Sequence, residues 1–427
     1  MKFNLIIGFL LMLFQVVGQD TLTLEACFRK AEKSRYSLIL ERSDLSVANV
    51  NRRLHKFSIL PGVNAFSSAD AGFGRILDPV SNQFSNTQVN SQSFGVNSSM
   101  NLFNGFNYFK ERDKLELLQA RSEMKRDQSL NGMYMDITSL YINLCLSQSQ
   151  IKQSNQRLVH FEHLLCVQRA LFESGKITQV DTLRTQNLVL KEQSEQDRLA
   201  EGFRTSLLQL NVLMGEDLEQ VYVFDADQIS VTTSYLNQDE LYMMKMNAID
   251  VELLIVEEKL AKSSVLPSLT LNAAVGTRFS TSLKEGFDPM EPTMAYRDQL
   301  DLNLFQNVGF QLSIPLFNKG EYLRNARIRR VRRDQLLAQS ELLELNLERR
   351  KKEVEIAYNS KLKQSQRLES SVENLENIYN VAMESYKAGK ITFSELQDIF
   401  LEWQAEILNL EATTFELIRV RLMRVEE

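Results

Sequence analysis

The sequence predicts a mainly α-helical protein that also contains four β-strands, in a chain built from two copies of one unit. Three observations lead to this prediction: the placement of the prolines, an internal repeat, and four runs in which apolar and polar residues alternate. The chain has only 6 prolines and 16 glycines in 427 residues. Residues 80–266 and 316–427 contain no proline. Because proline breaks helix interiors, both tracts are free to form very long helices.

The internal repeat consists of three pairs of short segments that recur in the same order. They are Leu60-Pro61 with Leu266-Pro267, Leu102–Asn104 with Leu316–Asn318, and Gly175–Thr178 with Gly389–Thr392. The offset is 206 residues for the first pair and 214 residues for the other two. Self-similarity of this kind indicates that a structural unit has been duplicated. The second copy therefore has a longer loop between its first two landmarks and is otherwise in register.

The two windows that hold the prolines contain alternating runs of the kind that form β-strands. In the last run, Val308 and Phe310 alternate with Asn307, Gly309 and Gln311. A soluble β-sandwich would show the same alternation, but four strands are too few for a sandwich with its own core. Each run is also long enough for a tilted transmembrane strand of roughly ten residues. Strands are expected at about 58–74, 91–104, 267–280 and 302–317.

Helical periodicity fills the tracts between these windows. Residues 106–174 and 321–388 are expected to form two long helices, each about 100 Å long at 1.5 Å per residue. Gly175 and Gly389 are expected to end them, because glycine readily adopts the left-handed conformation that terminates helices. Shorter helices are expected over about 21–57, 177–214, 238–264 and 391–424, with an irregular equatorial connector at 215–237.

The first eighteen residues have the pattern of a secretory signal peptide. Lys2 is followed by the apolar run Leu5–Leu13 and by the small-residue cleavage site Val16-Val17-Gly18. The apolar run is too short to span a bilayer as a helix. The predicted organisation is a signal peptide at 1–18, a first structural repeat at 19–214, the connector at 215–237 and a second repeat at 238–427.

The composition argues against several classes of protein. The 49 basic and 55 acidic residues give a net charge of −6, which makes a nucleic-acid partner a poor expectation. Three histidines in helical tracts provide no catalytic triad, so neither an enzyme nor a cofactor is expected. His160 and His163, with Cys166 three residues further on, could share a metal on one helix. A metal site needs a fuller ligand set, however, so none is expected.

The three cysteines are Cys27, Cys145 and Cys166. An odd number in an exported protein gives no disulfide framework. We expect all three to be small buried apolar side chains.

Four strands cannot span a membrane on their own. A strand with a free edge would leave backbone groups unsatisfied in lipid, and bacterial barrels close with at least about eight strands. Several chains must therefore share one barrel, and the polar face of each strand implies a wet lumen. The long helices would extend that barrel as a tube long enough to cross a periplasm.

These features together resemble the TolC-like outer-membrane efflux protein family over essentially all of residues 20–427. The resemblance rests on the order and duplication of the motifs, including Leu102–Gly105, Pro315–Gly320 and the two Gly-x-x-Thr tips. It implies a homotrimer with a shared twelve-stranded barrel in the outer-membrane lipid and a helical tunnel in the periplasm. The partners implied are a periplasmic adaptor (membrane fusion protein) and an inner-membrane pump of RND or ABC type.

The resemblance also implies roles for individual residues. Glu395 and Asp398 match two acidic positions at the narrow end of the tunnel, where a ring of carboxylates would favour cations. The alternative is that they are solvated carboxylates on an ordinary helix face. Asp181 and Tyr386 match a hydrogen bond that holds the tip closed. Ile391 stands where some members have an arginine, which puts an ionic version of this lock in doubt.

The two hairpin tips match the surfaces on which the adaptor docks. Their residues are Gly175, Lys176, Ile177 and Thr178 in the first copy, and Gly389, Lys390, Ile391 and Thr392 in the second. Each tip taken alone is equally well explained as a plain structural turn.

The function implied is a passive exit duct of a tripartite efflux or type I secretion system. It would carry substrates from pump and adaptor to the exterior, and no catalysis of its own is expected. The alternative is an exported coiled-coil periplasmic adaptor or scaffold protein. An adaptor should also carry Gly-rich lipoyl-like half-motifs beside its hairpin, and the sequence has none.

Overall fold

The computed structural model describes residues 21–77, 84–85, 88–175, 177–225, 238–283, 292–317 and 320–423. The predicted signal peptide at 1–18 and Lys176 lie outside these residues, as does the later part of the predicted connector. The chain forms two compact units. The first contains Met1–Asp44, Met124–Lys245 and Glu341–Glu427, and the second contains Leu45–Glu123 and Met246–Ser340.

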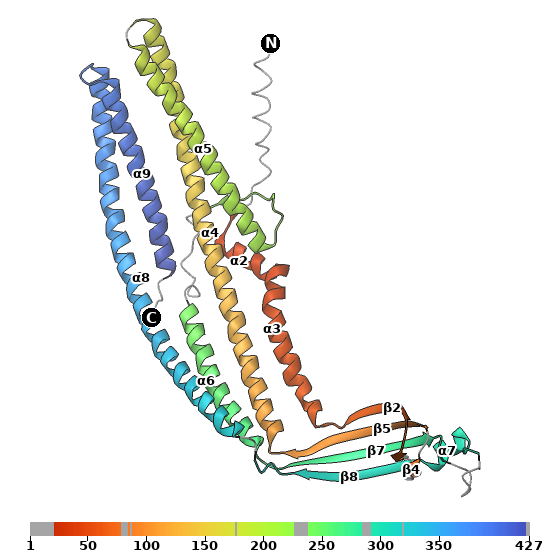
Figure 1. Ribbon diagram of the computed structural model, residues 1–427. Helices are drawn as coiled ribbons and strands as arrows, with labels where there is room; N and C mark the ends of the chain where they lie inside the picture. The colour runs from red at the N-terminus through yellow and green to blue at the C-terminus, as the bar shows by residue number, and fades with distance from the viewer. Residues whose placement is uncertain are drawn as a thin grey trace. The chain divides into compact units, whose positions relative to one another are not determined.

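Long helices dominate the secondary structure. The two longest, α4 (Asn107–Glu173) and α8 (Glu321–Lys387), have 67 residues each. A shorter helix follows each of them, α5 (Gln179–Met214) and α9 (Phe393–Leu422). A further helix, α6 (Asp239–Ser263; Figure 1), has 25 residues. In the described part of the chain, no helix is both long and apolar enough to cross a membrane.

The helix expected over 21–57 is broken instead of continuous. It divides at Ser34 into α2 (Leu24–Lys33) and α3 (Arg35–Leu54), and a 3₁₀ helix, η2 (His55–Ile59), follows. Ser34 has extended backbone angles, and its N–H donates to the carbonyl of Ala31. Gly215 approaches Ser34 so closely that a Cβ on Gly215 would lie 2.8 Å from the Cβ of Ser34. The break thus coincides with a tertiary contact, which helical periodicity does not encode.

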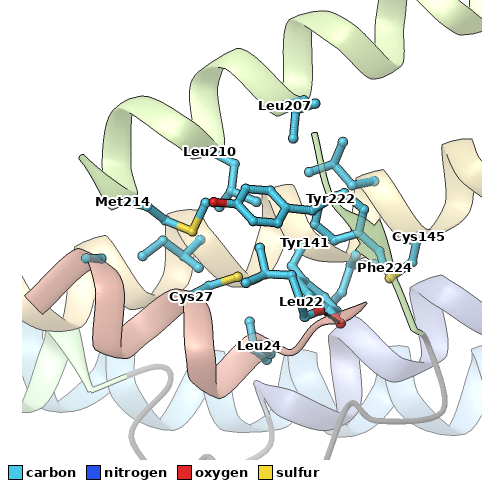
Figure 2. Close-up of a cluster of buried hydrophobic side chains, with 14 of the residues drawn as sticks. Leu22, Leu24, Cys27, Tyr141, Cys145, Leu207, Leu210, Met214, Tyr222 and Phe224 are labelled. Atoms are coloured by element: carbon cyan, nitrogen blue, oxygen red, sulfur yellow. Dashed lines mark hydrogen bonds between the residues drawn. The ribbon is translucent and has the colours of Figure 1, made fainter. Parts of the chain in front are cut away.

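The core of the first unit is a cluster of buried side chains from α2, α4 and α5 around a two-stranded parallel sheet (Figure 2). The two strands are β1 (Thr21–Leu22) and β6 (Val223–Phe224). The hydroxyl of Tyr141 donates to the carbonyl oxygens of Leu22 (2.8 Å) and Asp225 (3.1 Å). The buried ring of Tyr141 thus has its hydroxyl hydrogen-bonded, and these bonds hold Leu22 and Asp225 against α4.

Two of the three cysteines lie in this cluster. Burial raises the pKa of the Cys27 thiol and of the Cys145 thiol to about 12, so both are inert apolar side chains as expected. Cys166 is exposed, and the prediction that it is buried is wrong. Its position on α4 continues a helical face that neighbouring helices do not cover.

The second unit is built around a four-stranded antiparallel sheet in the order β2-β5-β7-β8 (Figure 1). Its strands are β2 (Gly62–Gly72), β5 (Val89–Asn104), β7 (Ser268–Ser280) and β8 (Phe305–Ser313). A short hairpin of β3 (Ile76–Leu77) and β4 (Phe84–Ser85) lies between the first two. The strands from the two sequence repeats therefore pair with each other through β5 and β7.

Two strands are shorter than the alternating pattern suggests. The strand expected at 58–74 begins at Gly62, because His55–Ile59 is helical. The strand expected at 302–317 begins at Phe305, because the short helix α7 (Tyr296–Leu302) extends to residue 302. The buried amide of Gln299 anchors α7 by accepting from the backbone N–H of Ser280 (2.9 Å) and donating to the carbonyl of Met294 (2.9 Å).

The two faces of this sheet differ in chemistry. One face carries rows of amide and hydroxyl side chains, and a hollow of about 430 Å³ on it is lined by residues that include Asn64, Asn97, Asn272, Asn307 and Gln311. The opposite face is apolar and open: Val308, Phe310 and Leu312 are 72%, 70% and 62% exposed. An exposed apolar band of this extent indicates a surface that a partner or lipid covers.

Candidate functional site: the two helical hairpin tips

Each long helix ends in a glycine that reverses the chain. Gly175 and Gly389 adopt left-handed φ angles of 73° and 71°. Their backbone N–H groups donate to the carbonyls of Phe172 (2.8 Å) and Tyr386 (2.9 Å), three residues earlier in each case. A side chain would meet nothing within 4 Å at either glycine, so the backbone angle, and not space, calls for glycine here.

The helix that follows each tip begins with the same capping box. At the first tip, Asp181 Oδ2 accepts from the N–H (3.2 Å) and the hydroxyl (2.7 Å) of Thr178. At the second tip, Glu395 Oε2 accepts from the N–H (2.7 Å) and the hydroxyl (2.9 Å) of Thr392. At the second tip the N–H of Glu395 also donates to the hydroxyl of Thr392 (3.3 Å). Such bonds satisfy backbone donors that a helix start leaves free. Both threonines are therefore explained as helix caps.

The two predicted constriction residues differ in their surroundings. Glu395 is exposed, and hydrogen bonds from the backbone N–H and then the hydroxyl of Thr392 lower the pKa of its carboxyl group. Asp398 is exposed one turn further along α9 and makes no hydrogen bond or ion pair with the described residues. In a single chain, Glu395 thus has a local structural role that Asp398 lacks.

The predicted closed-tip pair is not joined by a hydrogen bond. Asp181 is used by Thr178, as described above. Tyr386 is half-buried, with its ring 6.0 Å from that of Phe393 at an interplanar angle of 61°. Within the described part of the chain its hydroxyl has no hydrogen-bond partner. The two residues lie on different hairpins, and sequence matching alone could not decide whether one chain brings them together.

The remaining tip residues differ in how far their side chains are exposed. Lys390 is exposed, whereas Ile177 and Ile391 are half-buried. Ile391 lines an apolar groove of about 390 Å³ between α8 and α9, with Ile378, Val381, Ala382 and Ile399 among the other residues that line it. Sequence analysis missed this groove, although the β-branched residues Ile378 and Val381 on α8 and Ile399 on α9 were a usable signal.

Behind the tips lies an aromatic cluster shared by the two hairpins. Phe161, Leu165, Val189 and Phe400 are buried together, with Tyr379 and Trp403 packed against them. The ring of His160 stacks on that of Phe400 with 4.4 Å between centroids. Burial and the neighbouring His163 both lower the pKa of His160. His160 thus packs as an aromatic side chain, and no group of three potential ligands gathers among the described residues.

A buried ion pair links the two helices of the first hairpin. Arg157 Nη2 donates to Glu192 Oε1 at 2.7 Å, and Nε donates to both carboxylate oxygens at 3.1 Å. The hydroxyl of Ser154 also donates to Glu192. The side chains of Arg157 and Glu192 are only 8% and 11% exposed. Sequence analysis missed this pair, because residues 35 positions apart on two helices have no local spacing signal.

The fold is a duplicated chain with two long helical hairpins and a four-stranded sheet. Three solved structures share it. They are the outer-membrane channel CmeC of Campylobacter jejuni, the outer-membrane protein VceC of Vibrio cholerae, and the MtrE outer-membrane channel of Neisseria gonorrhoeae in its open state.

The similarity to these structures extends over nearly the whole chain. The TM-scores are 0.74 for CmeC, 0.71 for VceC and 0.71 for MtrE, at 15%, 13% and 11% sequence identity. The matches cover 94%, 94% and 95% of this chain, and 84%, 97% and 91% of the respective channels. At such identities they show the fold.

A family model also matches part of the sequence. Residues 30–216 match the model of the outer membrane efflux protein family, while no curated protein sequence matches the chain. The chain thus has the fold of a TolC-like outer-membrane efflux protein and carries that family's sequence pattern in its first half. The predicted fold class and the predicted resemblance are both confirmed.

Proposed function

We propose that the protein is the outer-membrane exit duct of a tripartite efflux or type I secretion system, acting as a passive homotrimeric channel. The observation that carries the proposal is the open, two-faced sheet of the second unit. Among the described residues, β2 and β8 each pair with a single strand, so the sheet has two free edges. One of its faces is apolar and exposed, and the other is lined with amides.

An open sheet of this kind is complete only when its edges are paired. In lipid, every backbone N–H and C=O group needs a partner, and four strands are too few to close a barrel. Three chains pairing β8 of one with β2 of the next would satisfy both edges and give twelve strands. The apolar band would then contact lipid, and the amide rows would line a water-filled lumen.

The helical parts are proposed to extend this barrel into the periplasm, with a signal peptide at 1–18 directing export. In this proposal 19–214 and 238–427 are the two structural repeats, joined by a connector at 215–237. The tips at Gly175–Thr178 and Gly389–Thr392 would dock on a periplasmic adaptor, which in turn contacts an inner-membrane pump of RND or ABC type. The pump would supply the energy, since the duct has no proposed catalysis.

The gate is proposed to lie at the tips. Glu395 and Asp398 from three chains would form a ring of carboxylates that favours cations, and Asp181 with Tyr386 would hold the closed state. The half-buried Tyr386, whose hydroxyl is unpartnered among the described residues, leaves a donor available for such a contact.

Conductance tests the proposal directly. Protein purified in detergent and added to planar lipid bilayers should insert and produce discrete single-channel currents. The matched control is a chain shortened by β8 (Phe305–Ser313), which should give none because the barrel cannot close. If the full-length trimer gives no channel, the proposal fails. Extraction from membranes without detergent would instead favour the soluble adaptor or scaffold.

A further inference from the structure

One row of the amide-lined face is aromatic instead of polar. Cross-strand neighbours place Phe66, Gly95, Gly276 and Phe305 in one line across all four strands. The neighbouring row toward the helices is Asn64, Asn97, Ala274 and Asn307. Cross-strand neighbours share a face. The phenylalanines therefore point to the same side as the asparagines, the side proposed to line the lumen.

The two glycines, which have no side chain, leave the space that the two phenylalanine rings occupy. A Cβ on Gly95 would lie 2.7 Å from Cζ of Phe66, and a Cβ on Gly276 would lie 3.0 Å from Cζ of Phe305. Each ring thus lies over the glycine of the adjacent strand and covers its backbone. A strand glycine that permits the close approach of a side chain is a recurrent reason for its presence. The arrangement holds both rings against the wall, and Phe66 remains 38% exposed.

The next row toward the far end of the sheet adds a positive charge. It contains Ser68, Ser93 and Arg278, and the hydroxyls of Ser68 and Ser93 are 2.7 Å apart. The guanidinium carbon of Arg278 lies 5.1 Å from the centre of the Phe305 ring, within the range of a cation–π contact. Aromatic surface and a cation therefore adjoin on a face that otherwise carries mainly amides and hydroxyls, with the carboxylate of Asp70 on β2 one row beyond Ser68.

We propose that Phe66, Phe305 and Arg278 form a binding site for planar aromatic anions on the lumen wall, on the amide-lined face of the sheet. This inference rests on the proposed function, because only a barrel turns this face into a lumen. Three chains would repeat the two phenylalanines, and the arginine of the adjoining row, around the lumen. A planar ring could stack on the phenylalanines while its anionic group contacts Arg278.

The test compares two anions of equal charge as blockers of single-channel current: 1-naphthalenesulfonate, which has an aromatic ring, and methanesulfonate, which has none. With the wild-type trimer, naphthalenesulfonate should block at a concentration about tenfold lower than methanesulfonate, a difference of the size expected for one aromatic contact. Equal blocking concentrations in an otherwise conducting channel would overturn the proposed binding site and leave the exit-duct proposal intact. The absence of any conductance would overturn both.

Three variants locate the effect. The double variant Phe66→Leu/Phe305→Leu keeps apolar volume but removes the rings, so the preference for naphthalenesulfonate should fall to about twofold or less. Arg278→Gln should weaken block by both anions. Phe310→Leu, on the same strand as Phe305 but on the apolar face, is the matched control and should leave both blocking concentrations unchanged. A preference that survives in the double variant, or that disappears in Phe310→Leu, contradicts the assignment.

Discussion

Asp181 and Glu395, 214 residues apart in sequence, make the same contact in the two halves of the chain: each carboxylate caps its own helix through the threonine three residues before it. The duplication has kept this cap although the acid differs. At Glu395 the cap coincides with a position proposed to line the constriction. An experiment on the gate must therefore separate loss of charge from loss of the cap.

The caps themselves give the first prediction. Thr178→Ala and Thr392→Ala should each destabilise the first turn of the following helix by roughly 1 kcal/mol, because an N-cap acceptor and a hydroxyl donor to the carboxylate are lost. Native-state amide hydrogen exchange at the tips should show faster exchange confined to that turn. Thr205→Ala, an exposed mid-helix threonine that donates to the carbonyl of Glu201, is the control and should not speed exchange. Equal effects at all three sites would contradict the capping role.

The second prediction concerns pH. The hydrogen bonds of Thr392 lower the pKa of Glu395 below its ordinary value of 4.5, so the ionised form stabilises the start of α9. This stabilisation is fully present above about pH 4.5 and is lost as the pH falls through the lowered pKa. A carboxyl-carbon NMR titration should find the midpoint below 4.5. In Thr392→Ala the carboxylate loses the hydroxyl donor but keeps the backbone N–H donor, so the midpoint should rise part of the way. A wild-type midpoint at or above 4.5 would be inconsistent with the cap.

The third prediction tests the gate while sparing the cap. Glu395→Gln keeps an acceptor oxygen for Thr392 but removes the charge, and Asp398→Asn removes the second charge. The double variant should raise single-channel conductance and reduce the cation-over-anion permeability ratio on the order of twofold to fivefold, since a carboxylate ring favours cations. Glu355→Gln, an exposed acid on α8, serves as the control. Unchanged selectivity in the double variant would remove both residues from the constriction.

Much of the fold could be predicted because it depends on local patterns. The absence of proline from 80–266 and 316–427 indicated α4 and α8, and Gly175 and Gly389 marked their ends to within two residues. Alternation indicated the strands. The sequence patterns did not predict two element boundaries that lie at tertiary contacts. One is the end of α2 at Ser34, which Gly215 approaches closely. The other is residue 302, where α7 replaces the start of a strand.

The site was harder to predict than the fold. Residue matching found the tip positions, but the capping of α9 by Glu395 and the hydrogen bonding of Asp181 to Thr178 depend on backbone geometry. The aromatic cluster around Phe400 and the Arg157–Glu192 pair join helices that are distant in sequence. No spacing rule on a single helix reports such contacts, and so the three-dimensional structure was needed to find them.

The Arg157–Glu192 pair gives the fourth prediction. Removing one member of a buried ion pair leaves an uncompensated charge, so Arg157→Met should destabilise the first hairpin by about 3–5 kcal/mol. The double variant Arg157→Met/Glu192→Leu should recover most of this loss, because two apolar side chains replace the pair. Urea unfolding, or hydrogen exchange along α4 and α5, measures both effects. Arg198→Met breaks the exposed pair with Glu195 and should cost less than about 1 kcal/mol. A double variant as unstable as the single would contradict the argument.

The fifth prediction concerns the glycines of the sheet. A Cβ on Gly95 would lie 2.7 Å from both the Phe66 ring and the carbonyl oxygen of Val275, and a Cβ on Gly276 would lie 2.6 Å from the carbonyl oxygen of Phe94. Rotation of a ring cannot relieve a clash with backbone oxygen. Gly95→Ala and Gly276→Ala should therefore weaken the β5–β7 pairing, with a cost of about 1–3 kcal/mol for overpacking.

Gly309, on β8, provides the matched control for this pair. A Cβ there would meet nothing within 4 Å, so Gly309→Ala should leave the sheet and its assembly intact. The measurement is the midpoint temperature for loss of β-structure by circular dichroism, together with the yield of detergent-resistant oligomer. We expect lower values for Gly95→Ala and Gly276→Ala and wild-type values for Gly309→Ala. If Gly95→Ala matched Gly309→Ala in both measurements, the close approach of β5 and β7 would be wrong, and with it the seating of Phe66 on the sheet.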